Sequence, residues 1–373
     1  MMEPIVNFFV RVFQWIGRGI GFVIGIILWP FMWAARWYGQ RGWMLKGIVG
    51  AALLLLVALY GYFIYATQVW INFNPNYIDN YKIESRNVSA GEQISAGSGT
   101  DTSRTCGRSA IADISSDLID YEVNQNPWIS SMILYKLGFF GIDWDHTPFL
   151  DNKASFQRGI NQAIRRTTTE LADNLGRVRT TSQIDNDLQD ARGNMQFDEE
   201  TWYFGLQPFG PKTPTPSYYR DAIAKLRAFN DRLQKCQAVF DARSDNLKIY
   251  LDRVASDIGS TSALLKERAE NYNYGFFDPR ADDRFWFAYG QLYAYYGLMK
   301  AAEADFEDVI KQRNLTSLYQ TMDAQFVAAL KIQPFLIANS REDGLFASHL
   351  TTMGFYILRV RSNMVEISNV LAQ

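Results

Sequence analysis

The chain has few of the residues on which most enzyme active sites depend. Its 373 residues include only two histidines, His146 and His349, and two cysteines, Cys106 and Cys236. It lacks the HExxH, CxxC, EF-hand, phosphate-loop, dinucleotide-glycine and serine-elbow motifs, so the common signatures of metal, redox, nucleotide and serine chemistry are absent. A net charge of −2 gives no electrostatic footprint for nucleic acid. We therefore expect a protein that is not an enzyme, with no cofactor, no metal and no nucleic-acid partner.

One arrangement could still support chemistry. His146 lies in the stretch GIDWDHTPF with Asp143 and Asp145, and these side chains, with His349, are suitable metal ligands or acid–base groups. The favoured interpretation is local, with an aspartate capping a turn and His349 donating a hydrogen bond at the flank of a helix. A cell-wall enzyme that acts through His146 is accordingly the least favoured function class.

Acidic residues are also absent from a long N-terminal segment, because none lies between Glu3 and Asp79. Within this segment the apolar run 47–71 carries no charge, and at 1.5 Å per residue its helical length exceeds the ~30 Å of a bilayer's hydrocarbon core. Tyrosines and Trp70 crowd its second half, as in an interfacial aromatic belt. The pattern predicts a transmembrane helix at 47–71 with Trp70 at the interface. No small-residue cleavage site follows it, which favours an anchor over a cleaved signal peptide.

Basic residues predict the orientation of this anchor. Arg36, Arg41 and Lys46 precede the apolar run, whereas the stretch after it is neutral until Asp79. Because lysine and arginine near a span stay on the cytoplasmic side, the rest of the chain is expected outside. We predict a bacterial inner-membrane protein with an N-terminal anchor and a large periplasmic domain.

Residues 1–42 have a different pattern. A polar stripe that includes Arg11 and Arg18 alternates with apolar residues such as Trp15, which is typical of an interfacial helix anchored by these three residues. The uncharged run 19–35 that follows is about 17 residues long, at the lower limit for spanning, and contains Pro30. The sequence favours an interfacial amphipathic helix with a re-entrant or short membrane hairpin, and a second complete span is the alternative.

Three glycines at four-residue spacing, Gly17, Gly21 and Gly25, lie in this region. Small residues at such spacing allow membrane helices to approach closely, so a helix-packing face is one interpretation. The other is that glycines are simply common in membrane helices, and the sequence leaves the choice open.

The remainder of the chain is expected to be helical. The stretch 85–109 is rich in Ser, Gly and Thr and predicts a tether or a long mobile loop, so 72–108 is expected to be a linker. Beyond them apolar residues recur at spacings of three and four, for example in the seam from Leu350 through Met353 to Ile357, and strand-like alternation is scarce. We predict an all-α fold, in which the N-terminal membrane hairpin and anchor precede a periplasmic bundle of long antiparallel helices at 109–373.

Three separated segments resemble a bacterial inner-membrane family known only as a domain of unknown function: FLDNKASFQRGI (149–160), FDARSDNLKIYLDRV (240–254) and ASHLTTMGFYILRVRSNMVEI (347–367). The resemblance covers roughly 109–373. It implies a single N-terminal anchor and a helical periplasmic domain, and it implies no activity. The segment 1–42 departs from the shorter N-terminus associated with that family.

Two further features concern cross-links and partners. Cys106 and Cys236 could pair in an oxidising compartment, although a small buried apolar role for Cys236 is the favoured alternative.

An aromatic-rich helix carries more rings than one face can bury, which suggests a partner surface. Its candidate residues are Phe285, Trp286, Tyr289, Tyr293 and Tyr296.

The favoured function is a non-enzymatic structural, scaffold or accessory subunit of an inner-membrane protein complex. Its expected partners are membrane lipids and either another copy of this chain or other inner-membrane proteins. The alternative is a lipid-binding or envelope-maintenance factor with an apolar groove between helices.

Overall fold

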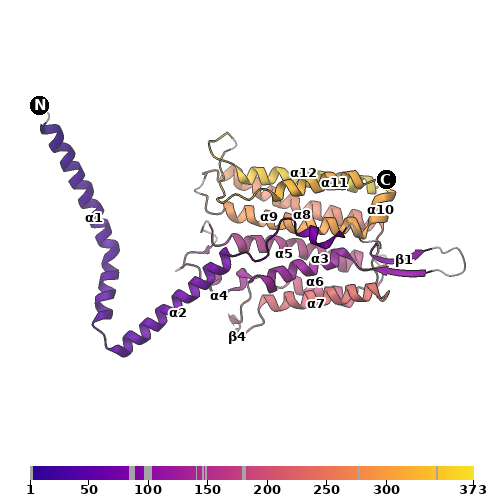
Figure 1. The fold of residues 1–373 in the computed structure, drawn as a ribbon, viewed down its shortest axis with the longest axis horizontal. Coiled ribbons are helices and arrows are strands. Elements are labelled where there is room, and N and C mark those ends of the chain that lie inside the picture. The colour runs from indigo at the N-terminus through magenta and orange to yellow at the C-terminus, as the bar shows by residue number, and fades with distance from the viewer. Residues whose placement is uncertain are drawn as a thin grey trace. The chain divides into compact units, whose positions relative to one another are not determined.

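A computed structural model describes most of the chain (Figure 1). The described residues are 3–83, 89–95, 103–139, 141–144, 147, 149–178, 182–275, 278–341 and 343–373. They form two compact units, Met1–Tyr62 and Phe63–Gln373. The unit boundary falls inside a helix, so the last turns of that helix belong to the second unit.

The first unit contains helix α1 (Glu3–Gly39) and most of helix α2 (Trp43–Gln68). Gly17–Gly39 and Trp43–Gln68 are each long and apolar enough to cross a membrane, and their side chains are almost wholly uncovered by the rest of the chain. These two helices are therefore compatible with an N-terminal membrane anchor.

Pro30 lies inside α1 without ending it, so the prediction of a hairpin within 19–35 is wrong. A proline removes one backbone N–H and crowds the preceding turn, but membrane helices tolerate this because local adjustments can satisfy the freed carbonyl. The helix continues to Gly39, and the chain turns at 40–42 instead.

The second unit is a bundle of antiparallel helices, which confirms the predicted all-α class. Its long helices are α3 (Ala110–Asp120), α5 (Asn152–Glu170), α6 (Asn186–Met195), α7 (Thr215–Gln234), α8 (Ser244–Asn271), α9 (Ala281–Asp305), α11 (Thr316–Leu330) and α12 (His349–Leu371). Shorter helical elements are η1 (Tyr77–Tyr81), η3 (Tyr121–Gln125), η4 (Ile129–Ser131), α4 (Ile133–Leu137), η6 (Leu171–Leu175) and α10 (Glu307–Gln312). The seam residues Leu350, Met353 and Ile357 are buried on α12, as their spacing predicts.

Helix α9 lies at the centre of the bundle and packs against α3, α5, α8, α11 and α12. Its closest neighbour is α5, and a glycine on each helix makes the contact close. A Cβ added at Gly159 would collide with the carbonyl of Phe287, and one at Gly290 would collide with the carbonyl of Phe156. The two backbones therefore touch where neither helix has a side chain.

The segment 72–108 is not the free linker that its composition predicts. Residues 69–83, here named the strap, lie along the bundle, with Ile78 and Ile83 buried and η1 in between. Farther on, β1 (Gly91–Ser95) and β2 (Ser103–Gly107) form an antiparallel hairpin with Gly91 opposite Gly107. Aromatic residues hold the strap to the core.

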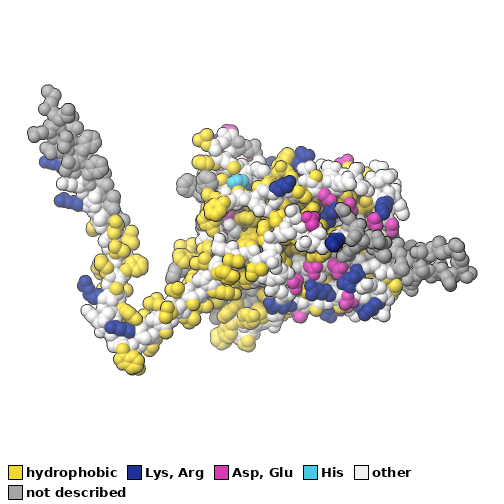
Figure 2. Space-filling model, in the orientation of Figure 1, with side chains coloured by type: hydrophobic (Ala, Val, Ile, Leu, Met, Phe, Trp, Pro, Cys, Tyr) yellow, Lys and Arg dark blue, Asp and Glu magenta, His cyan; other side chains and the backbone are white. Residues whose placement is uncertain are grey.

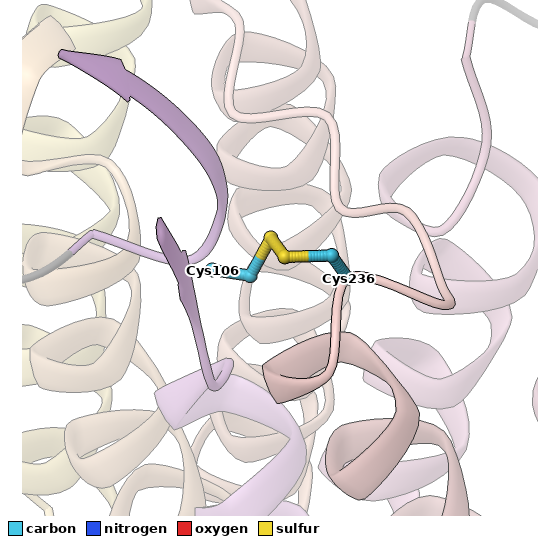
Figure 3. Close-up of a disulfide and its surroundings, with 2 residues drawn as sticks. All are labelled: Cys106 and Cys236. Carbon is cyan, nitrogen blue, oxygen red and sulfur yellow. A yellow bond between two sulfur atoms is a disulfide. The ribbon is translucent and has the colours of Figure 1, made fainter. Parts of the chain in front are cut away.

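A disulfide joins Cys106 on β2 to Cys236, just after the end of α7 (Figure 3). Cys236 has a positive φ of 59° and is not part of a helical seam, so its interpretation as a core residue is wrong. The bridge connects positions 130 residues apart in sequence and fastens the hairpin to the bundle.

Because the helices alternate in direction, the connections gather at two ends of the bundle (Figure 1). One end, named proximal, receives the last turns of α2 and carries the proximal loops 126–151, 196–214, 272–280 and 331–348. The proximal loops touch one another through the Phe149 and Phe335 rings, the Gly275 and Asn339 bridge, and the hydrogen bond from Trp128 to Glu199. The other end, named distal, carries the β1–β2 hairpin and the connections 171–185, 235–243 and 306–315.

Candidate functional site at the proximal end

The C-terminal end of α2 is held by a buried lysine. Lys153, in the first turn of α5, is 2% exposed, and its Nζ donates hydrogen bonds to the carbonyls of Ala66 (3.0 Å) and Val69 (2.8 Å). The last carbonyls of a helix have no partner within the helix and carry a partial negative charge, so an ammonium group satisfies both needs. Lys153 thereby fixes the end of α2 to the bundle.

Asn126 adds a second attachment. Its Oδ1 accepts from the N–H of Ile71 (3.0 Å) and its Nδ2 donates to the carbonyl of the same residue (3.0 Å). The side chain of Gln68 also donates to the carbonyl of Phe149 (2.7 Å). The end of α2 and the chain leaving it are thus held from α5, from the loop after η3 and from the loop before α5.

Burial shifts the pKa values of Lys153 and of the neighbouring Glu122. It lowers the pKa of Lys153 to about 8, although the neighbouring Glu122 carboxyl opposes this shift. Burial raises the pKa of Glu122, and its carboxyl oxygens have no hydrogen-bond partner among the described residues. At neutral pH the ammonium form of Lys153 predominates, while the desolvated Glu122 favours its neutral form.

Aromatic rings hold the strap to α5 and α9. The Trp70 ring lies 4.9 Å from that of Phe156 and 5.1 Å from that of Trp286, measured between centroids. Tyr77 stacks on Tyr293 at 4.6 Å, and its hydroxyl donates to the Tyr293 carbonyl (3.1 Å). Trp70 therefore packs on the bundle, and its predicted role at the lipid interface stays a prediction.

The proposed aromatic partner surface is corrected. Phe285, Tyr289 and Tyr293 are at most 2% exposed, and Trp286 and Tyr296 are half-buried against the same core. The prediction assumed that a helix buries one face. Because α9 is surrounded by other helices and by the strap, nearly its whole circumference is covered.

Carboxyl groups gather where α5 and α9 begin. Asp151 and Asp282 are buried, and Asp283 accepts a hydrogen bond from the Ser155 hydroxyl (2.8 Å). Burial, reinforced by the charge of Asp283, raises the pKa of Asp151 and raises that of Asp282 to about 8. Among the described residues, no group of three or more His, Cys, Asp or Glu side chains is arranged to hold a metal ion.

Exposed apolar side chains are concentrated in the proximal loops. Twelve large hydrophobic residues are exposed there, and we name them the apolar rim: Leu137, Phe139, Ile142, Phe149, Tyr203, Phe204, Phe209, Tyr272, Tyr274, Phe335, Leu345 and Phe346. Phe204 and Phe209 lie on the hairpin of β3 (Phe204–Leu206) and β4 (Phe209–Pro211). Figure 2 shows hydrophobic side chains gathered at this end of the bundle, whereas acidic and basic side chains cover the face beyond it.

Two grooves border the bundle. One, of about 560 Å³, runs between α8 and α12 near the proximal end; Ala269, Leu350, Gly354, Phe355 and Leu358 form its apolar lining, with Lys266 and Arg341 at its edge. The other, of about 670 Å³, lies beside the strap and α3 and is lined largely by asparagine, aspartate and tyrosine side chains.

The other predicted site residues are not brought together. No atom of the chain beyond their own helix lies within 4 Å of a Cβ placed at Gly17, Gly21 or Gly25. Arg11 and Trp15 are exposed on α1, as is Arg18.

Only one of the two histidines, His349, lies among the described residues. The Nδ1 of His349 accepts a hydrogen bond from the Ala338 N–H (2.9 Å). The ring therefore makes a local structural contact, but as an acceptor, whereas it was expected to donate. Burial lowers its pKa. Asp143 is exposed, and His146 and Asp145 lie outside the described residues.

The residues that sequence reasoning missed are the ones that attach α2. No role was assigned to Lys153 from the sequence, although it lies next to Ala154 and Phe156 on a helix that is largely buried. A lysine in that register is a signal for an internal partner, because an unpaired ammonium is rarely buried.

The fold and the proximal end define a helical-bundle domain that incorporates the end of an apolar, anchor-like helix. The chain belongs to a family described as an uncharacterized protein conserved in bacteria (DUF2333), whose model matches residues 120–275 and 279–373. No curated protein and no solved structure matches the chain.

Proposed function

We propose that the protein is a non-enzymatic accessory or scaffold subunit of the bacterial inner membrane, with the helical bundle in the periplasm and α1 and α2 in or on the membrane. The observation that carries this proposal is the attachment of α2 to the bundle by Lys153, Asn126 and Trp70. A catalytic domain on a tether needs no such attachment, whereas a structural subunit needs its membrane helix and its domain to move as one. The disulfide fits an oxidising compartment.

Topology is tested with reporters that are active only in the periplasm. A fusion after Gln373 is expected to be active and a fusion at Gln40 inactive, because the basic residues near Lys46 remain in the cytoplasm. Activity at Gln40 would overturn the orientation.

The scaffold role is tested by purifying the full chain in mild detergent and measuring the stoichiometry of every associated chain. Gly21 has open space around it, so a partner helix on the face of Gly17, Gly21 and Gly25 must come from another chain. Gly21→Ile, and deletion of 1–42, are expected to release that partner. Gly19→Ile is the matched control, because Gly19 lies on the opposite side of α1 and is equally uncrowded. Full retention of all partners by Gly21→Ile and by the deletion would contradict a scaffold that works through α1.

The groove between α8 and α12 favours lipid handling as the second candidate. Its lining is mostly apolar and it lies near the proximal end, and the two basic residues at its edge, Lys266 and Arg341, are paired there with Glu270 and Asp343. In native mass spectrometry this function predicts one bound phospholipid per chain. Gly354→Leu, whose Cβ would make only ordinary contacts with Ser262 and Leu265, adds a bulky side chain to the groove lining and is expected to abolish that binding without unfolding the bundle. Equal lipid retention by this variant would remove the candidate.

A further inference from the structure

The apolar rim distinguishes the two ends of the bundle. The proximal loops expose twelve large hydrophobic residues, whereas only Val178 and Val239 are exposed among the described residues of the distal connections. Single apolar residues on a surface are ordinary, but a concentration of large ones at one end of a molecule indicates a binding surface. We therefore expect the apolar rim to be covered by lipid or by another protein.

The position of α2 indicates which occupant. Lys46 is the last charged residue before the apolar run, and a hydrocarbon core of ~30 Å takes about 20 helical residues, which places the far boundary near Ala66. The Trp144 ring lies 4.8 Å from that of Phe63, about one turn before this boundary. The Phe139 ring lies 5.7 Å from that of Trp144. The rim residue Phe139 thus packs on a buried ring, Trp144, that contacts α2 at a level within the apolar layer.

We propose that the apolar rim enters the lipid interface of the periplasmic leaflet, so that the proximal end of the bundle rests in the membrane surface. This inference depends on the proposed span of α2. Charged residues on the same loops, among them Lys136, Asp143 and Arg341, limit the insertion to the headgroup boundary. The protruding residues Phe209, Phe335 and Leu345, at 79%, 94% and 100% exposed, are the anchors.

The test uses single cysteines labelled with an environment-sensitive fluorophore. The two native cysteines are paired and the chain has no free thiol, so labelling reports the introduced site. Phe209→Cys and Phe335→Cys sample the rim. Val178→Cys is the matched control, because this residue is an exposed apolar side chain at the distal end. Leu55→Cys reports on α2 itself.

The full chain is reconstituted in vesicles of phosphatidylethanolamine with a minority of phosphatidylglycerol, with or without spin-labelled lipid. Labels at 209 and 335 are expected to shift to the blue and to lose roughly half of their emission to the spin-labelled lipid, while the label at 178 changes in neither respect. Rim labels that behave like the label at 178 would overturn the inference. So would rim labels that shift to the blue without quenching, because a protein then covers the rim.

The label at Leu55 separates the two proposals. If it is quenched while the rim labels are not, the anchor stands and only the insertion of the rim fails. If the label at Leu55 is not quenched, the proposed membrane anchoring fails, and the inference fails with it.

Discussion

Lys153 is the residue on which the attachment of α2 most depends. Its side chain reaches from α5 to the end of α2 and donates to two carbonyls, that of Ala66 in a buried and that of Val69 in a part-buried hydrogen bond. The cost of removing its ammonium from water appears in the lowered pKa, about 8. A hydrocarbon side chain of the same length could neither donate these hydrogen bonds nor place a positive charge at the end of α2.

Lys153→Met is therefore expected to destabilise the bundle by about 2–3 kcal/mol, the usual loss when charge-assisted hydrogen bonds are removed and their acceptors stay buried. Thermal unfolding of the full chain in detergent measures this as a lower midpoint. Lys331→Met, at an exposed position on the same end of the bundle, is the control and should change stability by no more than about 0.5 kcal/mol. Equal midpoints for the two variants would contradict the role of Lys153.

Asp282 gives a pH dependence whose sign follows from burial. Its pKa is about 8 in the folded chain against an ordinary value of 3.8, so the folded state binds this proton more tightly than the unfolded state does. Its contribution favours folding below pH 4 and is lost as the pH rises from 4 to 8. Asp282→Asn, which is neutral at every pH, should gain stability relative to the native chain across that window.

The measurement is the unfolding midpoint of both proteins at pH 5 and pH 8. Asp231→Asn serves as an opposite control, because the Arg108 guanidinium lowers the pKa of Asp231 and the charged form is the stabilised one. A difference between the native chain and Asp282→Asn that is the same at both pH values would show that Asp282 does not titrate in this range.

Among the helices, the contact between α5 and α9 is the closest. Gly159→Ala and Gly290→Ala place a methyl group against a backbone carbonyl of the other helix, and neither backbone can move without shifting a core helix. Each variant should lose about 1–3 kcal/mol through overpacking. Gly193→Ala, on α6 with nothing within 4 Å, should instead gain about 0.5–1 kcal/mol from helix propensity. Chemical denaturation distinguishes the two signs, and stabilisation by Gly290→Ala would contradict the close packing.

The disulfide is the covalent link between the β1–β2 hairpin and the bundle. It closes a loop of 130 residues, and loop entropy sets an upper value of about 5 kcal/mol for its contribution. Cys106→Ser with Cys236→Ser should lower the unfolding midpoint, and a reductant should lower that of the native chain to the same value. The double variant is also its own control, since the reductant should leave it unchanged.

The sequence predicted the elements that depend on local periodicity and missed those that depend on neighbours. The helices and the apolar seam of α12 follow from the spacing of apolar residues, and they were predicted correctly. The position of α9 at the centre of the bundle could not be predicted, because its burial is set by the helices around it. Pro30 was misjudged for the same reason, since the cost of a proline in a helix depends on what surrounds that helix.

For the second unit as a whole, the strap decides whether the chain that leaves the end of α2 is free or packed on the bundle. Composition predicted a tether, but the amide of Ile71 donates to Asn126 and the rings of Trp70 and Tyr77 pack on α5 and α9. Hydrogen exchange of the full chain should therefore show protection of the Ile71, Tyr77 and Asp79 amides, all of which are hydrogen-bonded. If these amides exchange as fast as in an unstructured peptide, the segment is a flexible tether and its packing on the bundle is contradicted.

The long sequence separation within the strap contacts has a consequence for biogenesis. Tyr77 packs on Tyr293, 216 residues later, so a ribosome that makes roughly 5–20 residues per second needs on the order of 10–40 s to supply the partner. Throughout that interval α2 has been synthesised while the aromatic face of the strap has no helix to cover it. Packing of the strap on the bundle is thus a late step, and a nascent chain released before α9 would leave the aromatic side chains of the strap uncovered.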